Sequence, residues 1–162
     1  MKINIKKQSG IYTLTSEQIL PISLEKAWEF FTHPNNLDRI TPKEMQFEIT
    51  NNPPDKTYIG QIITYKIGIL PMVKSNWITE ITHFEDGKFF VDEQRFGPYK
   101  LWHHQHHFKA IEGGVEMTDI IHYKNPMWFL GTLANELFVK KQLQGIFDFR
   151  FKKVEEMFGK WN

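Results

Sequence analysis

The chain has 162 residues, with 20 Lys and Arg, 19 Asp and Glu, and no cysteine. This length fits a single domain with one hydrophobic core, and the net charge of +1 gives no electrostatic reason to expect nucleic acid as a partner. The lack of cysteine excludes disulfides, thiolate metal ligands and a cysteine nucleophile. Phe alone accounts for 14 residues, more than a small core needs, and such rings suit the lining of a pocket.

The N-terminal residues 1–7 are polar and basic, and the apolar segment of a signal peptide does not follow them. No stretch approaches the roughly 18 consecutive apolar residues of a membrane-spanning helix. We therefore expect a cytoplasmic protein without a transmembrane segment, forming a single domain over residues 1–162 that is ordered from about residue 10.

The first predicted strand covers residues 11–20, where β-branched and aromatic residues alternate. Ser23 is a suitable N-cap for a short amphipathic helix, because apolar residues recur at helical spacing over residues 24–31. After this helix Pro42 allows at most one further turn, since a proline disfavours the α conformation of the residue before it. The pattern predicts two short helices between the first and second strands.

From residue 45 to residue 124 every segment has the character of a strand, and turn residues interrupt it at five places. The interruptions lie at residues 51–55, 68–71, 85–87, 97–98 and 113–114. The six resulting strands are connected without helices, so they must be antiparallel, because parallel strands need a crossover. Together with residues 11–20 they predict a seven-stranded antiparallel sheet.

The last segment, from Pro126 to Phe158, is predicted to form one long helix with an apolar stripe. The stripe consists of Leu130, Leu133, Leu137, Leu143, Phe147, Phe151, Val154 and Phe158. A continuous helix of this length would span about 50 Å, so we expect a bend near Gly131 or Gly145. A twisted sheet curls around such a helix, and the space between them is a natural pocket.

Several local strings resemble the START-like superfamily, also called SRPBCC, which includes polyketide cyclases/dehydrases, coenzyme-Q-binding chaperones and lipid-transfer domains. Residues 18–31 (QILPISLEKAWEFF) resemble its strand, proline and helix with an aromatic pair, and residues 34–37 followed by 40–42 resemble its next turn. Residues 89–99 (FFVDEQRFGPY) and 102–108 (WHHQHHF) resemble one bacterial subgroup described only as ligand-binding. The resemblance implies an α+β helix-grip fold, in which the curved sheet wraps around the long C-terminal helix.

The histidine-rich strand has two distinct faces, because successive side chains of a strand alternate. One face carries Trp102, His104, His106 and Phe108, and the other carries His103, Gln105 and His107. The two large apolar side chains mark the first face as the inward one. His104 and His106 then line the cavity, where an imidazole can bind a ligand carbonyl or exchange a proton. The competing interpretation is that they are ordinary polar residues hydrogen-bonded across the sheet to Asp119 or Glu93.

A metal site on this strand is not expected, because two histidines per face fall short of the three or four protein ligands that zinc takes, even if Asp119 or Glu93 adds one carboxylate. Chelation of nickel by these histidines at the protein surface during purification is the simpler expectation.

Asp92 and Glu93 point to opposite faces of their strand, so only one of them can enter the cavity. The usual alternative for a charged strand residue is a cross-strand ion pair, here with Arg95, Lys100 or Lys109. Nucleotide and hydrolase motifs are also missing, so no cofactor is expected.

The candidates for catalysis are His104, His106 and Asp119. The candidates for ligand binding are Trp77, Trp102, His104, His106, Phe108, Phe90, Tyr123, Leu70, Phe147 and Phe151. An apolar loop at residues 67–73 is suited to act as a lid over the cavity mouth, and residues 127–130 form a second apolar patch. A buried hairpin tip or a dimer contact is the alternative explanation of the loop.

These observations favour a non-catalytic protein that binds a hydrophobic small molecule, such as a lipid, an isoprenoid or quinone, or a polyketide-like compound, in an internal cavity. One alternative is an enzyme of the cyclase/dehydrase type that uses the cavity histidines and a carboxylate. Another is a protein-interaction or quinone-chaperone role that uses the apolar loop. The sequence leaves open whether the protein is a monomer or a homodimer.

Overall fold

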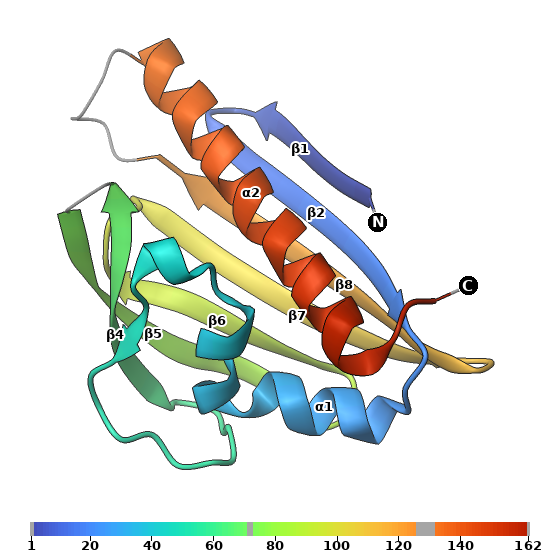
Figure 1. Ribbon diagram of the computed structural model, residues 1–162. Helices are drawn as coiled ribbons and strands as arrows, with labels where there is room; N and C mark the ends of the chain where they lie inside the picture. The colour runs from blue at the N-terminus through green and yellow to red at the C-terminus, as the bar shows by residue number, and fades with distance from the viewer. Residues whose placement is uncertain (1, 71–72, 126–131, 162) are drawn as a thin grey trace.

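The structure, a computed structural model, describes residues 2–70, 73–125 and 132–161. Its described part contains one antiparallel sheet whose strands follow the order β1-β2-β8-β7-β6-β5-β4-β3. The sheet curls but does not close, and a long helix, α2, crosses its concave face (Figure 1). The expected α+β helix-grip architecture is confirmed.

The strands of the sheet are β1 (Lys2–Gln8), β2 (Ile11–Leu20), β3 (Glu48–Ile49), β4 (Ile62–Leu70), β5 (Val73–Glu85), β6 (Phe89–Phe96), β7 (Leu101–Ile111) and β8 (Gly114–Lys124). The six strands predicted between residues 45 and 124 correspond to β3 to β8. Gly87 and Gly113 adopt φ values of +69° and +79° in the two tight hairpin turns, a conformation that glycine takes without a steric penalty.

The sheet has eight strands among the described residues rather than the seven predicted, because residues 2–8 add β1 at one edge. This strand pairs with β2 along its whole length, and Ile3 and Ile5 pack against the core. Its other side chains are polar and include three lysines, which is usual for an edge strand that must not pair with another molecule. That polarity is why the segment looked like an unstructured terminus.

The segment between β2 and β3 forms α1 (Leu24–Thr32) followed by three single 3₁₀ turns, η1 (Pro34–Asn36), η2 (Asp38–Ile40) and η3 (Lys43–Met45). Ser23 is the N-cap of α1, and its hydroxyl accepts a hydrogen bond of 3.2 Å from the backbone N–H of Lys26. The predicted second helix is thus reduced to isolated turns, consistent with the restriction that Pro42 imposes. In Figure 1 these turns lie beside α2 and in front of β4.

The described part of α2 runs from Thr132 to Phe158, with unbroken helical structure through Gly145. Its buried residues include Leu143, Phe147, Phe151 and Val154, which confirms that part of the predicted stripe, and Val139, which the prediction did not include. Leu137 is an exception, because its side chain is 62% exposed. The predicted helix start at Pro126 and the possible bend at Gly131 lie outside the described residues.

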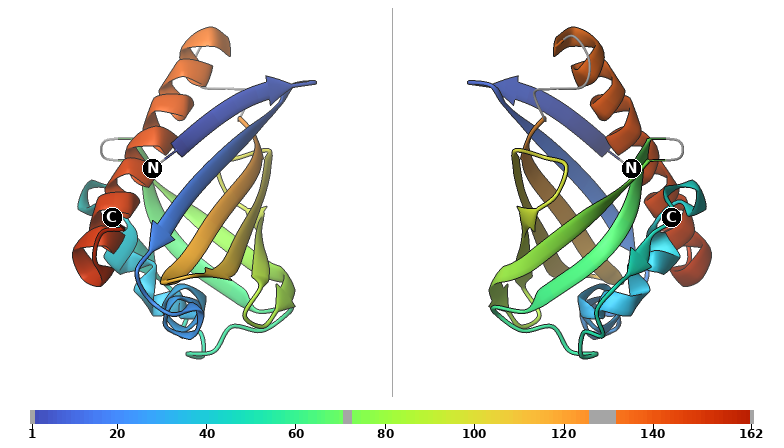
Figure 2. Two further views of the ribbon diagram at one scale, coloured as in Figure 1. Left: turned by 90° about the vertical axis from the view of Figure 1, so that its right-hand side faces the viewer. Right: turned by 90° about the vertical axis from the view of Figure 1, so that its left-hand side faces the viewer.

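Two groups of buried residues hold the layers together. One joins α1, the 3₁₀ turns and the end of α2 to β4, β5, β6 and β7, and includes Phe30, Trp77 and Phe108. The other joins the middle of α2 to β2 and β8, and includes Leu14 and Phe147. Figure 2 shows the resulting arrangement, with α1 and the 3₁₀ turns closing one end of the space between α2 and the sheet.

Gly114 at the start of β8 tests the tightness of this packing. A Cβ atom there would lie 2.3 Å from the carbonyl oxygen of Leu20 and 2.7 Å from the ring of Trp161. We therefore expect Gly114→Ala to lower the free energy of unfolding by about 1–3 kcal/mol, because the backbone must move to admit the methyl group. Urea unfolding followed by far-UV circular dichroism measures this loss.

The matched control is Gly145→Ala in α2, where a Cβ atom would meet nothing within 4 Å and the site is exposed. This variant should be more stable than the wild type by about 0.5–1 kcal/mol, since alanine has the higher helix propensity. Equal effects of the two substitutions would contradict the described packing at Gly114.

Candidate functional site

A cavity of about 180 Å³ lies between the concave face of the sheet, α2 and the segment of α1 and the 3₁₀ turns. Most of its lining is apolar and includes Ile63, Trp77, Ile81, Phe90, Trp102, Leu143, Ile146 and Phe147. The volume is smaller than the range of about 300–1,000 Å³ usual for drug-sized ligands. The cavity therefore suits a compact apolar molecule.

Three polar residues of the lining, Asp92, His104 and His106, form a cluster with Asp119, which contacts both histidines but is not itself part of the lining. We call these four residues the His–Asp cluster. The Nε2 atom of His104 lies 3.0 Å from Oδ1 of Asp119, and Nε2 of His106 lies 2.8 Å from Oδ2 of Asp92. The second nitrogen of each ring faces the other carboxylate, at 3.5 Å from Asp92 for His104 and 3.0 Å from Asp119 for His106. Each imidazole thus lies between both carboxylates.

The register of three central strands explains this arrangement. Asp92 of β6 is paired with His104 of β7, and His106 of β7 is paired with Asp119 of β8. Because residues two apart on a strand point to the same face, His104 and His106 both enter the cavity side. Their ring centroids are only 3.7 Å apart.

The carboxyl groups of the His–Asp cluster are held ionised. Burial is the largest influence on both and raises their pKa, but the contacts with His104 and His106 outweigh it. The net result lowers the pKa of Asp92, with a further contribution from the Arg150 guanidinium of α2, and lowers the pKa of Asp119 well below its usual range.

The two imidazoles are affected in opposite directions. Burial is again the largest influence and lowers the pKa of His104, and the positive charge on His106 lowers it further. At His106, contacts with Asp119 and Asp92 outweigh burial and raise the pKa. The pair of rings therefore holds its positive charge on His106, where both carboxylates can stabilise it.

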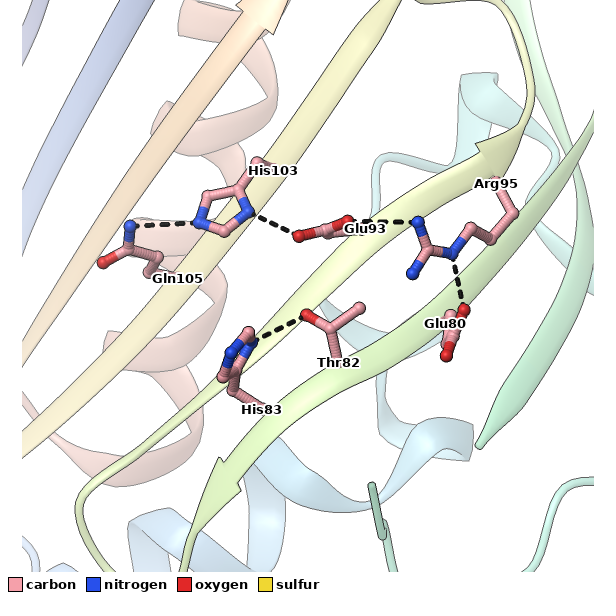
Figure 3. A network of polar contacts seen from close by, with 7 residues as sticks. All are labelled: Glu80, Thr82, His83, Glu93, Arg95, His103 and Gln105. Carbon is pink, nitrogen blue, oxygen red and sulfur yellow. Dashed lines mark hydrogen bonds and ion pairs between the residues drawn. The ribbon is translucent and has the colours of Figure 1, made fainter. Parts of the chain in front are cut away.

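The outer face of the same strands carries a separate polar network. His103 hydrogen-bonds through Nδ1 to Glu93 at 2.8 Å and through Nε2 to Gln105 at 3.1 Å. Glu93 in turn pairs with Arg95, which also pairs with Glu80 across the sheet. Figure 3 shows this network running across β7, β6 and β5.

Of the Asp92–Glu93 pair, Asp92 lines the cavity, while Glu93 pairs with Arg95 of the same strand rather than across the sheet. The expected cross-strand contact of the inner histidines is made with Asp119, by both His104 and His106, whereas Glu93 bonds to the outer His103. For His104 and His106, cross-strand pairing and contact with the cavity are therefore compatible.

Six of the predicted ligand-binding residues line the cavity: Trp77, Phe90, Trp102, His104, His106 and Phe147. Three others are buried in the cores instead, because α1 and the strands around them leave no space there. These are Phe108, which packs against Trp28 and Phe31, Tyr123, which stacks on Tyr12 at 5.1 Å, and Phe151. The side chain of Leu70 lies outside the described residues.

Asp92 and Arg150 also line the cavity but were not among the candidate ligand-binding residues, although the sequence contained a signal for each. Asp92 follows Phe90 by two residues and therefore shares its face of β6. Arg150 follows Phe147 by three residues on α2 and stacks over its ring at 5.0 Å. Among the described residues the Nε–H of Arg150 is buried without a hydrogen-bond partner, so a ligand acceptor can satisfy it.

The proposed lid over residues 67–73 and the apolar patch at 127–130 fall wholly or partly outside the described residues, so both stay predictions. Among the described helices, none is both long and apolar enough to cross a membrane.

No protein-family model and no curated protein matches the sequence. Solved structures do match over most of the chain. A START superfamily protein from Mycobacterium smegmatis has a TM-score of 0.66 at 9% identity, covering 90% of this chain and 98% of its own. The major latex-like protein 151 of Panax ginseng has a TM-score of 0.64 at 13% identity, covering 93% and 99%.

A protein from Chromobacterium violaceum has a TM-score of 0.70 at 10% identity, covering 91% of this chain and 97% of its own. The chain therefore has the START-like, helix-grip fold, as the resemblance of residues 18–31 and 89–108 implied. The identities are low enough that the likeness extends to the fold alone, and function must be argued from the cavity.

The hydrogen bond between Asp119 and His104 should contribute measurably to stability. We expect Asp119→Asn to lower the free energy of unfolding at pH 7 by about 1–3 kcal/mol, because two buried imidazoles lose their ionised partner. The folded protein lowers the pKa of Asp119. The wild-type advantage is therefore present above the unfolded-state pKa of about 3.9 and is lost as the pH falls below it.

Urea unfolding of both proteins between pH 3 and pH 7 measures this difference. Glu93→Gln is the matched control, because Glu93 bonds to His103 on the outer face at a side-chain exposure of 27%. Its effect should stay below about 1 kcal/mol. An Asp119→Asn deficit that does not shrink toward acid pH would contradict the assigned ionisation.

Proposed function

We propose that the protein binds a small, largely apolar molecule in the cavity and directs a polar group of that molecule toward the His–Asp cluster. The observation that carries the proposal is the chemistry of the lining, in which aromatic and aliphatic side chains predominate and Asp92, His104 and His106 form a compact polar cluster among them. This division is typical of sites that bury an apolar body and orient it by a few polar contacts.

The size of the cavity narrows the class of ligand. A volume of about 180 Å³ favours a compact ring compound or a short isoprenoid over a long acyl chain. The buried Nε–H of Arg150 offers a donor to a carbonyl, hydroxyl or carboxylate oxygen of the ligand. A polyketide-like or quinone-like molecule combines both features.

A cavity-filling substitution tests this function. Ile146 of α2 lines the cavity and is half-buried, so Ile146→Trp should occupy part of the ligand space. We expect the affinity for the apolar dye anilinonaphthalene sulfonate to fall at least about tenfold, or about 1.4 kcal/mol. Energy transfer from Trp77 and Trp102, which both line the cavity, reports on binding.

Gln144→Trp is the matched control, because residue 144 is exposed on the same helix. It should leave dye affinity within about twofold of the wild type, which is under about 0.5 kcal/mol. Equal weakening by both variants, or a wild-type protein that binds no dye and retains no small molecule in native mass spectrometry, would overturn the proposal. Near-UV circular dichroism confirms that each variant is folded.

A second candidate function is proton transfer on the bound molecule. It is favoured by the opposite pKa shifts of the two rings: burial and the neighbouring His106 lower the pKa of His104, whereas contacts with Asp119 and Asp92 outweigh burial and raise that of His106. Such a separation assigns acid and base roles in enzymes. On this hypothesis a poly-β-ketone is cyclised or dehydrated by the wild type, and His106→Gln removes the conversion while dye binding persists. Mass spectrometry of the products decides it, with His103→Gln as the control. A lack of conversion by the wild type would reject the enzyme hypothesis.

A further inference from the structure

Three donor atoms of the His–Asp cluster converge on one point at the cavity wall. One donor atom each from Asp92, His104 and His106 lies within 4.8 Å of the other two. Oδ2 of Asp92 is 2.8 Å from Nε2 of His106 and 3.5 Å from Nδ1 of His104. Donors bound to one zinc ion at about 2.0–2.1 Å stand about 3.3 Å apart in a tetrahedral site. The observed separations lie on either side of that value.

Asp119 occupies the position of the outer carboxylate in a metal site. Its Oδ1 atom lies 3.0 Å from Nε2 of His104 and 3.0 Å from Nδ1 of His106, which are the nitrogens that do not face Asp92. Metal-binding histidines almost always donate their second N–H to a carboxylate, a backbone carbonyl or a water molecule, which fixes the tautomer and the ring orientation. Here one carboxylate oxygen does this for both rings.

This tautomer assignment leaves an electrostatic requirement. If both rings donate to Asp119, then Nδ1 of His104 and Nε2 of His106 each present a lone pair toward the Asp92 carboxylate. Three electron-rich atoms facing one another in a buried position need a positive species between them. A proton can meet this need, and so can a metal ion bound to all three atoms.

The charge of the surroundings also permits a divalent ion. Asp92 and Asp119 bring two negative charges, which a divalent ion with neutral imidazoles would balance. Arg150 of α2 lines the same cavity and adds one positive charge, and Tyr65 of β4 lines it as a neutral phenol. The side chains of His104, His106 and Asp92 are only 7%, 14% and 17% exposed, so bulk water screens them little.

The outer histidines of β7 provide an internal comparison. Both ring nitrogens of His103 are engaged, by Glu93 and by Gln105, and Nε2 of His107 contacts Gln105. These rings therefore present no converging lone pairs, although they share the strand and its spacing with the inner ones. Of the two faces, the inner one brings two imidazole nitrogens and a carboxylate oxygen close together and places a second carboxylate against the other nitrogen of each ring.

We propose that Asp92, His104 and His106 bind one divalent transition-metal ion of the zinc or iron(II) class, with Asp119 as the residue that orients both imidazoles. A set of two nitrogens and one oxygen suits these ions and not calcium or magnesium, which prefer oxygen ligands alone. The three ligands line the cavity, so the remaining coordination positions face it and are open to water or to the polar group of a ligand. The metal site does not depend on the proposed binding of an apolar molecule.

The test uses the full chain without an affinity tag, freed of metal by chelator and titrated with Co²⁺ and then Zn²⁺. We expect one Co²⁺ per chain with visible d–d absorption, and its displacement by Zn²⁺. Asp92→Asn and His106→Gln should each weaken Co²⁺ binding at least about 100-fold, and Asp119→Asn about 10- to 100-fold, as for other orienting carboxylates. His103→Gln, the matched control on the outer face, should bind Co²⁺ as the wild type does.

Two results would overturn the metal site. One is a wild-type protein that shows no stoichiometric Co²⁺ binding, and the other is loss of binding in His103→Gln with retention in Asp92→Asn, which would indicate surface chelation. Near-UV circular dichroism excludes misfolding, and Asp92→Asn, nearly isosteric, keeps the test valid if His106→Gln does not fold. Dye binding, measured in parallel, separates failure of the metal site from failure of the apolar cavity.

Discussion

The mutual satisfaction of two buried carboxylates and two buried imidazoles is the constraint on which the cavity depends. Burying an unpaired carboxylate costs several kcal/mol, on the order of the whole stability of a domain. Asp92 and Asp119 avoid this cost because His104 and His106 contact both of them. Since β6, β7 and β8 supply these residues in direct register, the sheet can keep a polar wall inside an otherwise apolar interior.

The strand β7 shows how one stretch of sequence serves two environments. Its inner histidines face the cavity and the carboxylates of β6 and β8, whereas its outer histidines bond to Glu93 and Gln105 on the convex face. The outer network is exposed and makes a modest contribution to stability. The inner cluster is shielded from water, so its electrostatic interactions are stronger, and it is the better suited of the two to bind a ligand or transfer a proton.

The fold alone does not determine what such a cavity does. The solved structures with the same fold are only 9–13% identical in the three cases compared, although each is covered almost completely. In this fold the side chains on the inner wall decide the chemistry. In this chain they include the inner residues of the His–Asp cluster and Arg150, which stacks on Phe147 within a largely apolar lining.

The sequence by itself determined the order of elements, seven of the strands and the inward face of β7, because turn residues and the alternation of side chains are local properties. Strand β1 escaped prediction, since an edge strand tolerates the lysines that make it look unstructured. Only the tertiary structure decided that Asp92 lies opposite His104, that Asp119 contacts both rings, and that Phe108 and Tyr123 are core residues rather than lining. The reason is physical: alternation fixes which face a residue occupies, but pairing register, the curl of the sheet and the placement of α1 and α2 decide what that face meets.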